Sequence, residues 1–310
     1  MKARLERRVP LPWEHVKSCD EDARAGERID AILRASSYVQ ADRDTAFLRD
    51  NATRGVRLQL DYLKTEEILR ASGVERTIVV FGSTHLRESA TARAELEAAR
   101  RDARADPGDA ALGRALRVAE HRVELSRYYD IGRELGRLVG QSGDPGLAVL
   151  TGGGPGGMEA ANRGAFDVGA KSIGLNISLP REQYPNPYLT PGLCMRFHYF
   201  AMRKLHFMKR AVALVALPGG FGTMDELFCA LTLIQTRKNA AIPVVLIGEA
   251  YWRKVFDADF LLESGSIDEE DRELFWYAES AQQAWTSILA WHRRNGGPLS
   301  GQSETKEDRS

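Results

Sequence analysis

The chain has no excess of charge of either sign. Its 310 residues include 43 lysines and arginines and 43 aspartates and glutamates, so the formal net charge is zero. A neutral chain generates no long-range field that would attract a polyanion, which argues against nucleic acid or an anionic membrane surface as the main partner. We therefore expect any bound anion to be held by local contacts.

Cysteine is scarce, and long apolar runs are absent. Cys19, Cys194 and Cys229 are far apart and odd in number, which indicates a reducing compartment and not a disulfide framework. No apolar run is long enough to span a bilayer. The N-terminal segment MKARLERRVPLPWEHVK lacks the apolar stretch of a secretory signal. We therefore expect a cytoplasmic protein with no membrane partner.

Several motifs of known chemistry are also missing. The sequence contains no H-E-x-x-H zinc motif, no paired C-x-x-C, no G-x-S-x-G nucleophile turn and no G-K pair of a triphosphate-binding loop. These absences give no reason to expect a metal, a cofactor or a covalent nucleophile.

What the sequence does contain is an alternation of short apolar runs with longer helical patterns. The first run, TIVVF, is rich in β-branched residues and is closed by Gly82, as a buried parallel strand is, and similar runs follow it. They fall at 77–81, 147–150, 172–177, 211–217, 243–247 and 275–277. Helical patterns fall at 44–72, 128–140, 158–168, 200–210 and 223–237. The alternation predicts an α/β fold with a Rossmann-like, doubly wound parallel sheet, whose ligands bind beyond the carboxyl ends of the strands.

The domain organisation follows from where the alternation of predicted strands and helices begins, is interrupted and ends. We expect an N-terminal helical extension over 1–73, a nucleotide-binding catalytic domain over 74–292 and a disordered polar tail over 293–310. Residues 89–127, almost all Ala, Arg, Glu, Asp and Leu, interrupt the domain as a predicted helical hairpin. The hairpin can be a solvated decoration, an oligomer contact or a lid.

The first glycine-rich turn is TGGGPGGM, residues 151–158. Its glycines let backbone N–H groups approach a phosphate or sugar, with a helix dipole behind them. A dinucleotide site would need an acid at the end of the strand 172–177, and none is present, which argues against an NAD-dependent oxidoreductase. We expect nucleotide contacts from Gly152, Gly153 and Gly154, although a tight turn that binds nothing also fits the pattern.

The second glycine-rich turn is LPGGFGTMDE, residues 217–226, at the start of the predicted helix 223–237. Free N–H groups at a helix start attract an anion, and the missing G-K pair favours a monophosphate. The residues expected to hold the phosphate are Pro218, Gly219, Gly220, Gly222 and Thr223.

Glu226 has two interpretations. Together with Thr223 it matches a capping box, in which the Glu side chain bonds back to the cap N–H and stabilises the helix by about 1 kcal/mol. Its place beside a predicted anion site at the end of a strand allows a different role, since a carboxylate there can engage ribose hydroxyls or a water. The second role is the functional hypothesis.

The third candidate segment is HYFAMRKLHFMK, residues 198–209, where Arg203 and Lys204 interrupt an otherwise apolar helix. A basic pair can extend to solvent from such a helix, or Arg203 can point into a nucleotide site. His198 and His206 are eight residues apart, which does not match the spacing of a helical zinc site, and we interpret both as ordinary histidines.

In this order, the motifs resemble the Lonely Guy family. The matching features are the glycines of 152–157, the trio 202–204 and the run PGGFGTMDE at 218–226, and the stretch VRLQLDYLK at 56–64 is similar to the longer bacterial branch. The resemblance covers roughly residues 45–290. Members are often labelled lysine decarboxylases, but the S-x-H-K motif of a pyridoxal-phosphate lysine is missing here.

The resemblance implies a phosphoribohydrolase. Such an enzyme cleaves the N-glycosidic bond of a purine nucleoside 5′-monophosphate, of cytokinin type or AMP, to free base and ribose 5-phosphate, and it assembles as a homodimer or larger oligomer. The resemblance implies catalysis by Arg203 and Glu226, with Lys204 among the nucleotide-binding residues. Asp225, where Glu is more usual, and the 89–127 insertion depart from the family pattern. The rival function on the same fold is a non-catalytic nucleotide sensor or a carrier resembling molybdenum-cofactor carrier proteins.

Overall fold

The computed structural model describes residues 9–179, 184–295 and 299, and the chain divides into two compact units, residues 1–60 and 61–310. Of the tail predicted over 293–310, residues 296–298 and 300–310 lie outside the described residues. Residues 293–295 are the last residues of a helix, so the prediction of disorder was wrong for these three.

The first unit consists of short helices. They are η1 (Pro12–Glu14), α1 (Ala25–Leu33), η2 (Ser36–Tyr38), α2 (Thr45–Arg49), η3 (Asn51–Thr53) and the beginning of α3 (Arg54–Ala71), which continues into the second unit. In the described part of this unit the buried residues are Ala25 and Thr53.

The helix predicted over 44–72 is therefore interrupted. Asp50 is extended, with φ −62° and ψ 153°, and its side chain accepts a hydrogen bond of 2.8 Å from the N–H of Ala52. A short acid that bonds to nearby backbone competes with the helical pattern, which explains the break. The end of the helix was predicted correctly, because Gly73 follows α3 with φ 64°.

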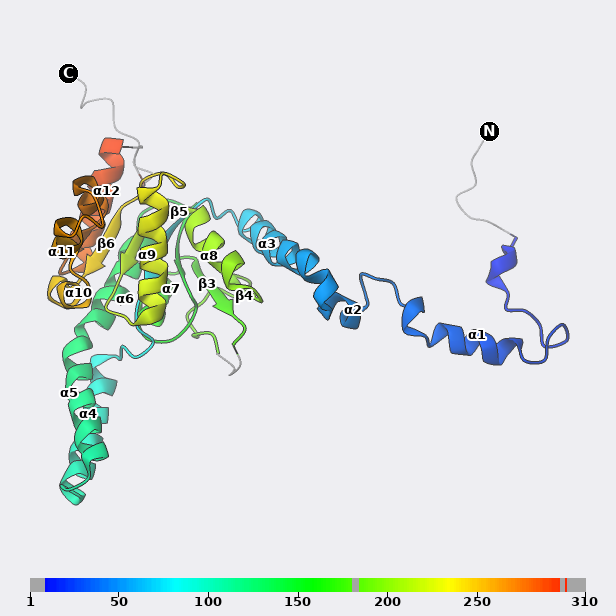
Figure 1. The fold of residues 1–310 in the computed structure, drawn as a ribbon, viewed down its shortest axis with the longest axis horizontal. Coiled ribbons are helices and arrows are strands. Elements are labelled where there is room, and N and C mark those ends of the chain that lie inside the picture. The colour runs from blue at the N-terminus through cyan, green and yellow to red at the C-terminus, as the bar shows by residue number, and fades with distance from the viewer. Residues whose placement is uncertain (1–8, 180–183, 296–298, 300–310) are drawn as a thin grey trace. The chain divides into compact units, whose positions relative to one another are not determined.

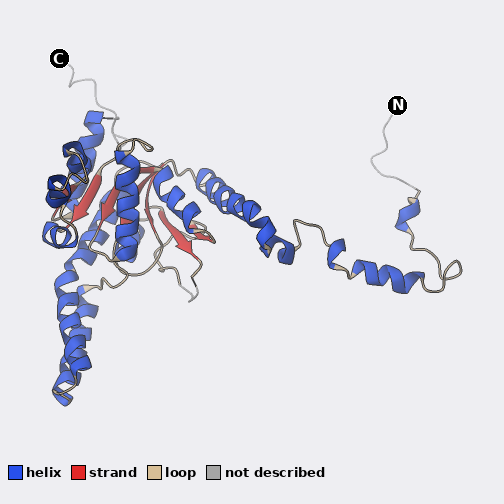
Figure 2. Cartoon of the chain, in the orientation of Figure 1, coloured by secondary structure: helices blue, strands red, loops and turns tan. Residues whose placement is uncertain are grey.

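The second unit is built on a seven-stranded sheet in which every pair of neighbours is parallel (Figure 2). The strands are β1 (Arg76–Phe81), β2 (Leu147–Thr151), β3 (Ser172–Ile177), β4 (Cys194–Phe197), β5 (Ala211–Ala216), β6 (Val244–Ile247) and β7 (Trp276–Ala278). Their order is β4-β3-β2-β1-β5-β6-β7, so the winding direction changes between β1 and β5. The predicted doubly wound α/β fold is confirmed, and β4 is a strand that the sequence patterns did not indicate.

Helices cover both faces of this sheet (Figure 1). One core contains side chains of α6 (Arg127–Gly140), α7 (Gly157–Asp167) and α12 (Ala281–Asn295) with Ile78 and Val80 of β1. The other contains side chains of α8 (Phe200–Lys209), α9 (Phe221–Gln235) and α10 (Glu249–Val255) with Val79 and Phe81 of β1. α11 (Ala258–Glu263) and η4 (Glu269–Leu274) precede β7. Because successive side chains of a strand alternate between faces, β1 contributes to both cores.

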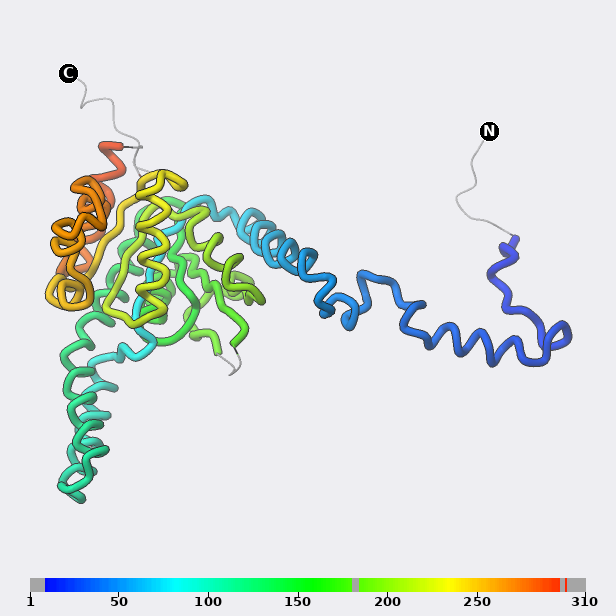
Figure 3. Tube along the Cα trace, viewed as in Figure 1, coloured from blue at the N-terminus to red at the C-terminus, as the bar shows by residue number. Residues whose placement is uncertain are grey.

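Between β1 and α6 the chain forms two further helices, α4 (Ser89–Ala105) and α5 (Ala110–Leu125), which pack against each other (Figure 3). Asp109 caps α5, accepting a hydrogen bond of 2.6 Å from the N–H of Ala111. We call this pair of helices the hairpin.

Two kinds of feature are absent from the described residues. No helix among them is both long and apolar enough to cross a membrane. No cluster of three or more His, Cys, Asp or Glu side chains among them could hold a metal ion.

Candidate active site

A cavity of about 350 Å³ lies where the winding direction changes, beyond the carboxyl ends of β1 and β5. Its volume is in the range of small-molecule sites, about 300–1,000 Å³. Three segments provide most of its wall: the loop after β1, the first half of α8 and the start of α9. The residues that line it are Phe81, Gly82, Ser83, Thr84, His85, Met158, Phe200, Arg203, Gly220, Phe221, Gly222, Thr223, Asp225 and Glu226. The position agrees with the general rule for open α/β sheets.

The start of α9 faces this cavity without a side-chain cap. The N-cap residue is Gly220, whose carbonyl accepts hydrogen bonds of 3.0 Å from the N–H groups of Thr223 and Met224. The N–H groups of Phe221 and Gly222 have no hydrogen-bond partner among the described residues. Unpaired N–H groups at a helix start, with the positive end of the helix dipole behind them, favour an anion.

Helix α9 begins at Phe221, two residues before the predicted start at Thr223. This difference excludes one of the two interpretations of Glu226. The capping box that the sequence allowed is not formed, because Thr223 and Glu226 lie inside the helix and Gly220 is the N-cap.

Glu226 itself lies in α9 with only 8% of its surface exposed. Its carboxylate makes no hydrogen bond or ion pair with any described residue, although it lines the cavity. Burial raises the pKa of Glu226, while Lys204 and then Arg203 oppose the rise. A buried carboxyl group without a partner costs stability, and such groups concentrate at functional sites.

Arg203 reaches the same cavity from α8. Its Nε donates a hydrogen bond of 2.7 Å to the carbonyl of Leu175, and its guanidinium lies 5.0 Å from the centre of the Phe207 ring. Burial lowers the pKa of Arg203, and the nearby Glu226 carboxylate raises it. Since an arginine remains charged in proteins, the cavity holds a fixed cation and a buried carboxyl group.

Lys204 does not line the cavity. Its Nζ bonds to Oδ1 of Asp225 at 2.6 Å. Burial alone would lower the pKa of Lys204, but the hydrogen bond with Asp225 outweighs it and the pKa is raised. The predicted nucleotide-binding lysine is thus paired with Asp225, and it acts on the cavity through its charge near Glu226.

The glycines of the first turn have different surroundings. Gly152 borders Arg203 so closely that a Cβ there would lie 2.5 Å from Nη2 of the guanidinium. The carbonyls of Gly153 and Gly154 accept hydrogen bonds of 2.9 and 3.0 Å from the backbone and side chain of Asn186. Neither Gly153 nor Gly154 lines the cavity, and both serve instead to anchor the turn.

The remaining predicted residues, those of the second glycine-rich turn, are divided between two adjoining cavities. Gly220, Gly222 and Thr223 line it directly. Pro218 and Gly219 line a smaller cavity beside it.

The main part of the wall that was not predicted is the loop after β1. Ser83, Thr84 and His85 line the cavity, and the carbonyl of Ser83 accepts a hydrogen bond of 2.9 Å from the N–H of Gly157. Gly156, with φ 74°, makes this contact possible, because a Cβ there would lie 2.2 Å from the Ser83 oxygen. The signal was present in the sequence: the loop directly follows the predicted strand 77–81, at the same edge of the sheet as the two glycine-rich turns.

The chain is similar to several known proteins. A family model described as "Possible lysine decarboxylase" matches residues 158–288. Two cytokinin riboside 5′-monophosphate phosphoribohydrolases of Arabidopsis thaliana are similar in sequence. LOG1 is 29% identical over 160 residues, 50% of this chain and 72% of the relative. LOG3 is 28% identical over 162 residues, 51% of this chain and 73% of the relative.

Solved structures are also similar to this chain. A molybdenum cofactor carrier protein from Chlamydomonas reinhardtii is 21% identical, with a TM-score of 0.42, over 70% of this chain and 99% of that one. A molybdenum cofactor binding protein from Rippkaea orientalis is 17% identical, with a TM-score of 0.39, over 53% of this chain and 87% of that one.

Proposed function

We propose that this chain, which belongs to the Lonely Guy family, hydrolyses the N-glycosidic bond of a purine nucleoside 5′-monophosphate to free base and ribose 5-phosphate. One observation carries the proposal. A buried carboxyl group without a partner, Glu226, shares a cavity with Arg203 and with the unpaired N–H groups at the start of α9. This combination suits a substrate that has a phosphate and, beside it, a carbon that becomes positively charged during the reaction.

The proposed reaction is the attack of water on the anomeric carbon of the ribose. The oxygen of water bonds to this carbon, the bond to the base nitrogen breaks, and the base takes the electron pair together with a proton that derives from the water. The transition state resembles an oxocarbenium ion, as in glycoside hydrolysis. The Glu226 carboxylate stabilises this positive charge and holds the ribose hydroxyls and the water, while Arg203 positions the nucleotide and assists departure of the base.

The phosphate takes no part in bond breaking, but its binding helps to align the sugar. Binding energy from a remote group can be used in this way, so a substrate without the group loses kcat as well as affinity. The test is to incubate the protein with AMP or with adenosine and to measure released adenine by chromatography. We expect AMP to be by far the better substrate, and comparable turnover of the two would contradict the proposed role of the phosphate.

A second measurement separates hydrolysis from binding alone. Calorimetry of the wild-type chain with AMP detects binding even when no bond is cleaved. Binding without any release of base from AMP or from a prenylated AMP would contradict the hydrolase and favour a nucleotide sensor or carrier. A panel of nucleoside monophosphates, scored by free base, then identifies the preferred base. The predicted homo-oligomer and cytoplasmic location belong to the same proposal.

A further inference from the structure

A second, smaller cavity of about 100 Å³ adjoins the one that contains Glu226. Ser83, His85 and Gly220 line both cavities, so a molecule in the larger one can extend into the smaller. The smaller cavity has room for a group of a few heavy atoms. Its other wall includes Gly219 and a residue of the inserted hairpin, Arg122 of α5.

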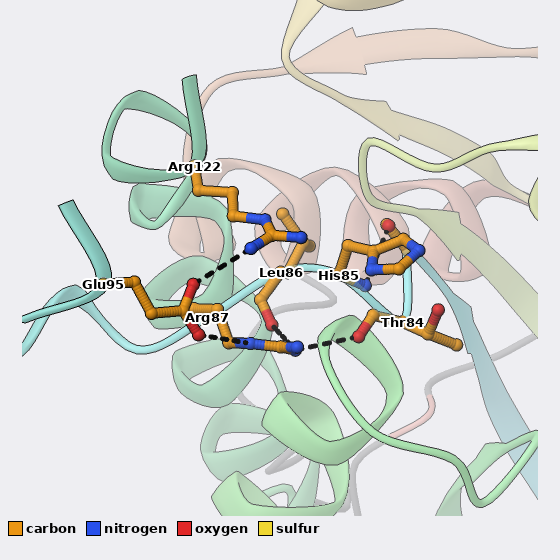
Figure 4. A network of polar contacts seen from close by, with 7 residues as sticks. Thr84, His85, Leu86, Arg87, Glu95 and Arg122 are labelled. Atoms are coloured by element: carbon orange, nitrogen blue, oxygen red, sulfur yellow. Dashed lines mark hydrogen bonds and ion pairs between the residues drawn. The ribbon is translucent and has the colours of Figure 1, made fainter. Parts of the chain in front are cut away.

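Arg122 is held in place by a chain of ionic contacts (Figure 4). Its Nη1 bonds to Oε2 of Glu95 on α4 at 3.1 Å, and Oε1 of the same carboxylate is 3.4 Å from Nε of Arg87. Arg87 in turn donates through Nη1 to the carbonyls of Thr84 and Leu86, at 3.0 and 3.3 Å. The network thus links both helices of the hairpin to the loop that forms the cavity wall.

The network leaves a positive charge at the smaller cavity. Two guanidinium groups share one carboxylate, and Nε and Nη2 of Arg122 make no hydrogen bond with any described residue. Figure 4 shows the side chain extending from α5 toward His85. A guanidinium with two free donors matches the geometry of a phosphate, which it can bind with paired hydrogen bonds. Gly220 lies on the wall that the two cavities share. It is the N-cap of α9 and directly precedes Phe221 and Gly222, whose N–H groups are unpaired among the described residues.

We propose that Arg122 contacts the 5′-phosphate of the nucleotide, so that the inserted hairpin is part of the substrate site. Arg87 and Glu95 are positioning residues that orient this guanidinium. The proposal rests on the proposed function and extends it, because it assigns the phosphate to the smaller cavity and the sugar and base to the larger one. It also decides among the roles left open for the hairpin, since neither a solvated decoration nor an oligomer contact needs a cation at the cavity.

The test compares Arg122→Met with wild type on AMP and on adenosine. Losing a charge-assisted contact to phosphate should lower kcat/KM for AMP on the order of 10- to 100-fold. The slow turnover of adenosine should stay within about twofold, because adenosine lacks the group that Arg122 contacts. Arg122→Lys should recover part of the loss, since it keeps the charge but not the paired donors. Equal losses for both substrates would overturn the proposal, because they would indicate a structural role.

Arg117→Met is the matched control. It removes the same charge from the exposed side of the same helix, away from both cavities, and should leave both substrates unchanged. Glu95→Gln should raise KM for AMP more than it changes the turnover of adenosine, because it frees the guanidinium to move.

Calorimetry keeps this test independent of hydrolysis. If wild type binds AMP but releases no adenine, the proposed function fails, and weaker AMP binding by Arg122→Met would still support the phosphate contact. If wild type hydrolyses AMP and Arg122→Met behaves identically, the phosphate contact alone fails.

Discussion

The two helices that carry Arg203 and Glu226 differ in how other elements hold the backbone in front of them. At the start of α8, the carboxylate of Asp61 accepts hydrogen bonds of 2.9 Å from the N–H groups of His198 and Tyr199, the two residues before the helix. Neither helix has a side-chain cap, but in front of α9, whose N-cap is Gly220, no side chain of a described residue bonds to the N–H groups of Gly219 or Gly220.

The far end of α8 is also held by the protein. Glu66 of α3 pairs with Arg210 at 2.6 Å and with Lys209 at 2.8 Å. Burial would raise the pKa of Glu66, but the hydrogen bonds from Arg210 and Lys209 outweigh it and hold the pKa at about 2. Because the pKa of Glu66 in the folded protein is below the ordinary carboxyl value, the stabilisation from these ion pairs is present at neutral pH. It is lost as the pH falls toward 2 and Glu66 becomes protonated.

The difference teaches which of the two helices the protein anchors through another helix. Asp61 and Glu66 of α3 bond to residues just before α8 and at its end, so the helix that carries Arg203 is anchored at both ends. α9 keeps polar groups unsatisfied beside a buried carboxyl group, and folded proteins accept that cost mainly where a ligand supplies the missing partner. Variants can test each side of this contrast.

The largest effect is expected at Glu226. Glu226→Gln preserves shape and removes the charge that stabilises the transition state, so the rate of adenine release from AMP should fall about 100- to 1,000-fold. AMP affinity, measured by calorimetry, should change much less. A variant that keeps wild-type turnover would contradict the catalytic role, and so would one whose whole loss comes from AMP affinity.

The same variant should also be more stable than wild type. Burial raises the pKa of Glu226 in the folded state, so the ionised form opposes folding above that pKa and the protonated form does not below it. The gain in melting temperature should therefore be present at neutral pH and disappear in acid. A loss of stability at neutral pH would show that Glu226 supports the fold.

The next effect is expected at Gly220, where the unfinished helix start can be completed artificially. A Cβ at this position has no neighbour within 4 Å, and the backbone is extended, with φ −89°. Gly220→Asp should cap α9 and stabilise the fold by about a few tenths of a kcal/mol, while its negative charge repels the phosphate. AMP affinity should fall on the order of tenfold or more.

Gly220→Asn is the control for this change, since it offers a similar cap without the charge. We expect a similar gain in melting temperature and a smaller loss of AMP affinity. Equal losses from the two variants would mean that the side chain blocks the site by its bulk, and no loss from either would place the phosphate away from α9.

The contrast between the helices was only partly predictable from sequence. The glycine run and the strand before it located the turn that leads into α9, since both signals are local. The start of the helix was placed at Thr223 because Thr followed by Glu three residues later is the usual cap pattern, whereas the structure begins the helix at Phe221. Glycine as an N-cap gives no side-chain signal.

The supports of α8 were not predictable, because they join residues far apart in the chain. Asp61 is separated from His198 by 137 positions, and Glu66 from Arg210 by 144. Within VRLQLDYLK, nothing in the local sequence marks Asp61 as the partner of a distant helix. The edge strand β4 was missed for a related reason: it is short, and exposed Cys194 and Arg196 alternate with its buried residues.

A smaller effect is expected from Asp61→Ala. It removes one acceptor that serves two N–H groups in a partly exposed place, so the free energy of unfolding should fall by about 1 to 2 kcal/mol. Asp61→Asn retains an oxygen and should lose less. Urea unfolding of both variants measures this. An unchanged midpoint for Asp61→Ala would show that α8 does not depend on α3 for its start.

The smallest effect is a displacement of the pH profile, without loss of turnover at its maximum. Glu226 must be ionised to stabilise the transition state, so activity falls as the pH drops through its raised pKa. Lys204 lowers this pKa and Asp225 raises it, although the two are bonded to each other. Lys204→Met should therefore move the acid limb of kcat/KM to higher pH, and Asp225→Asn should move it to lower pH. Shifts in the same direction would mean that the variants act by disturbing α8 or α9, and that the charges near Glu226 do not set its ionisation.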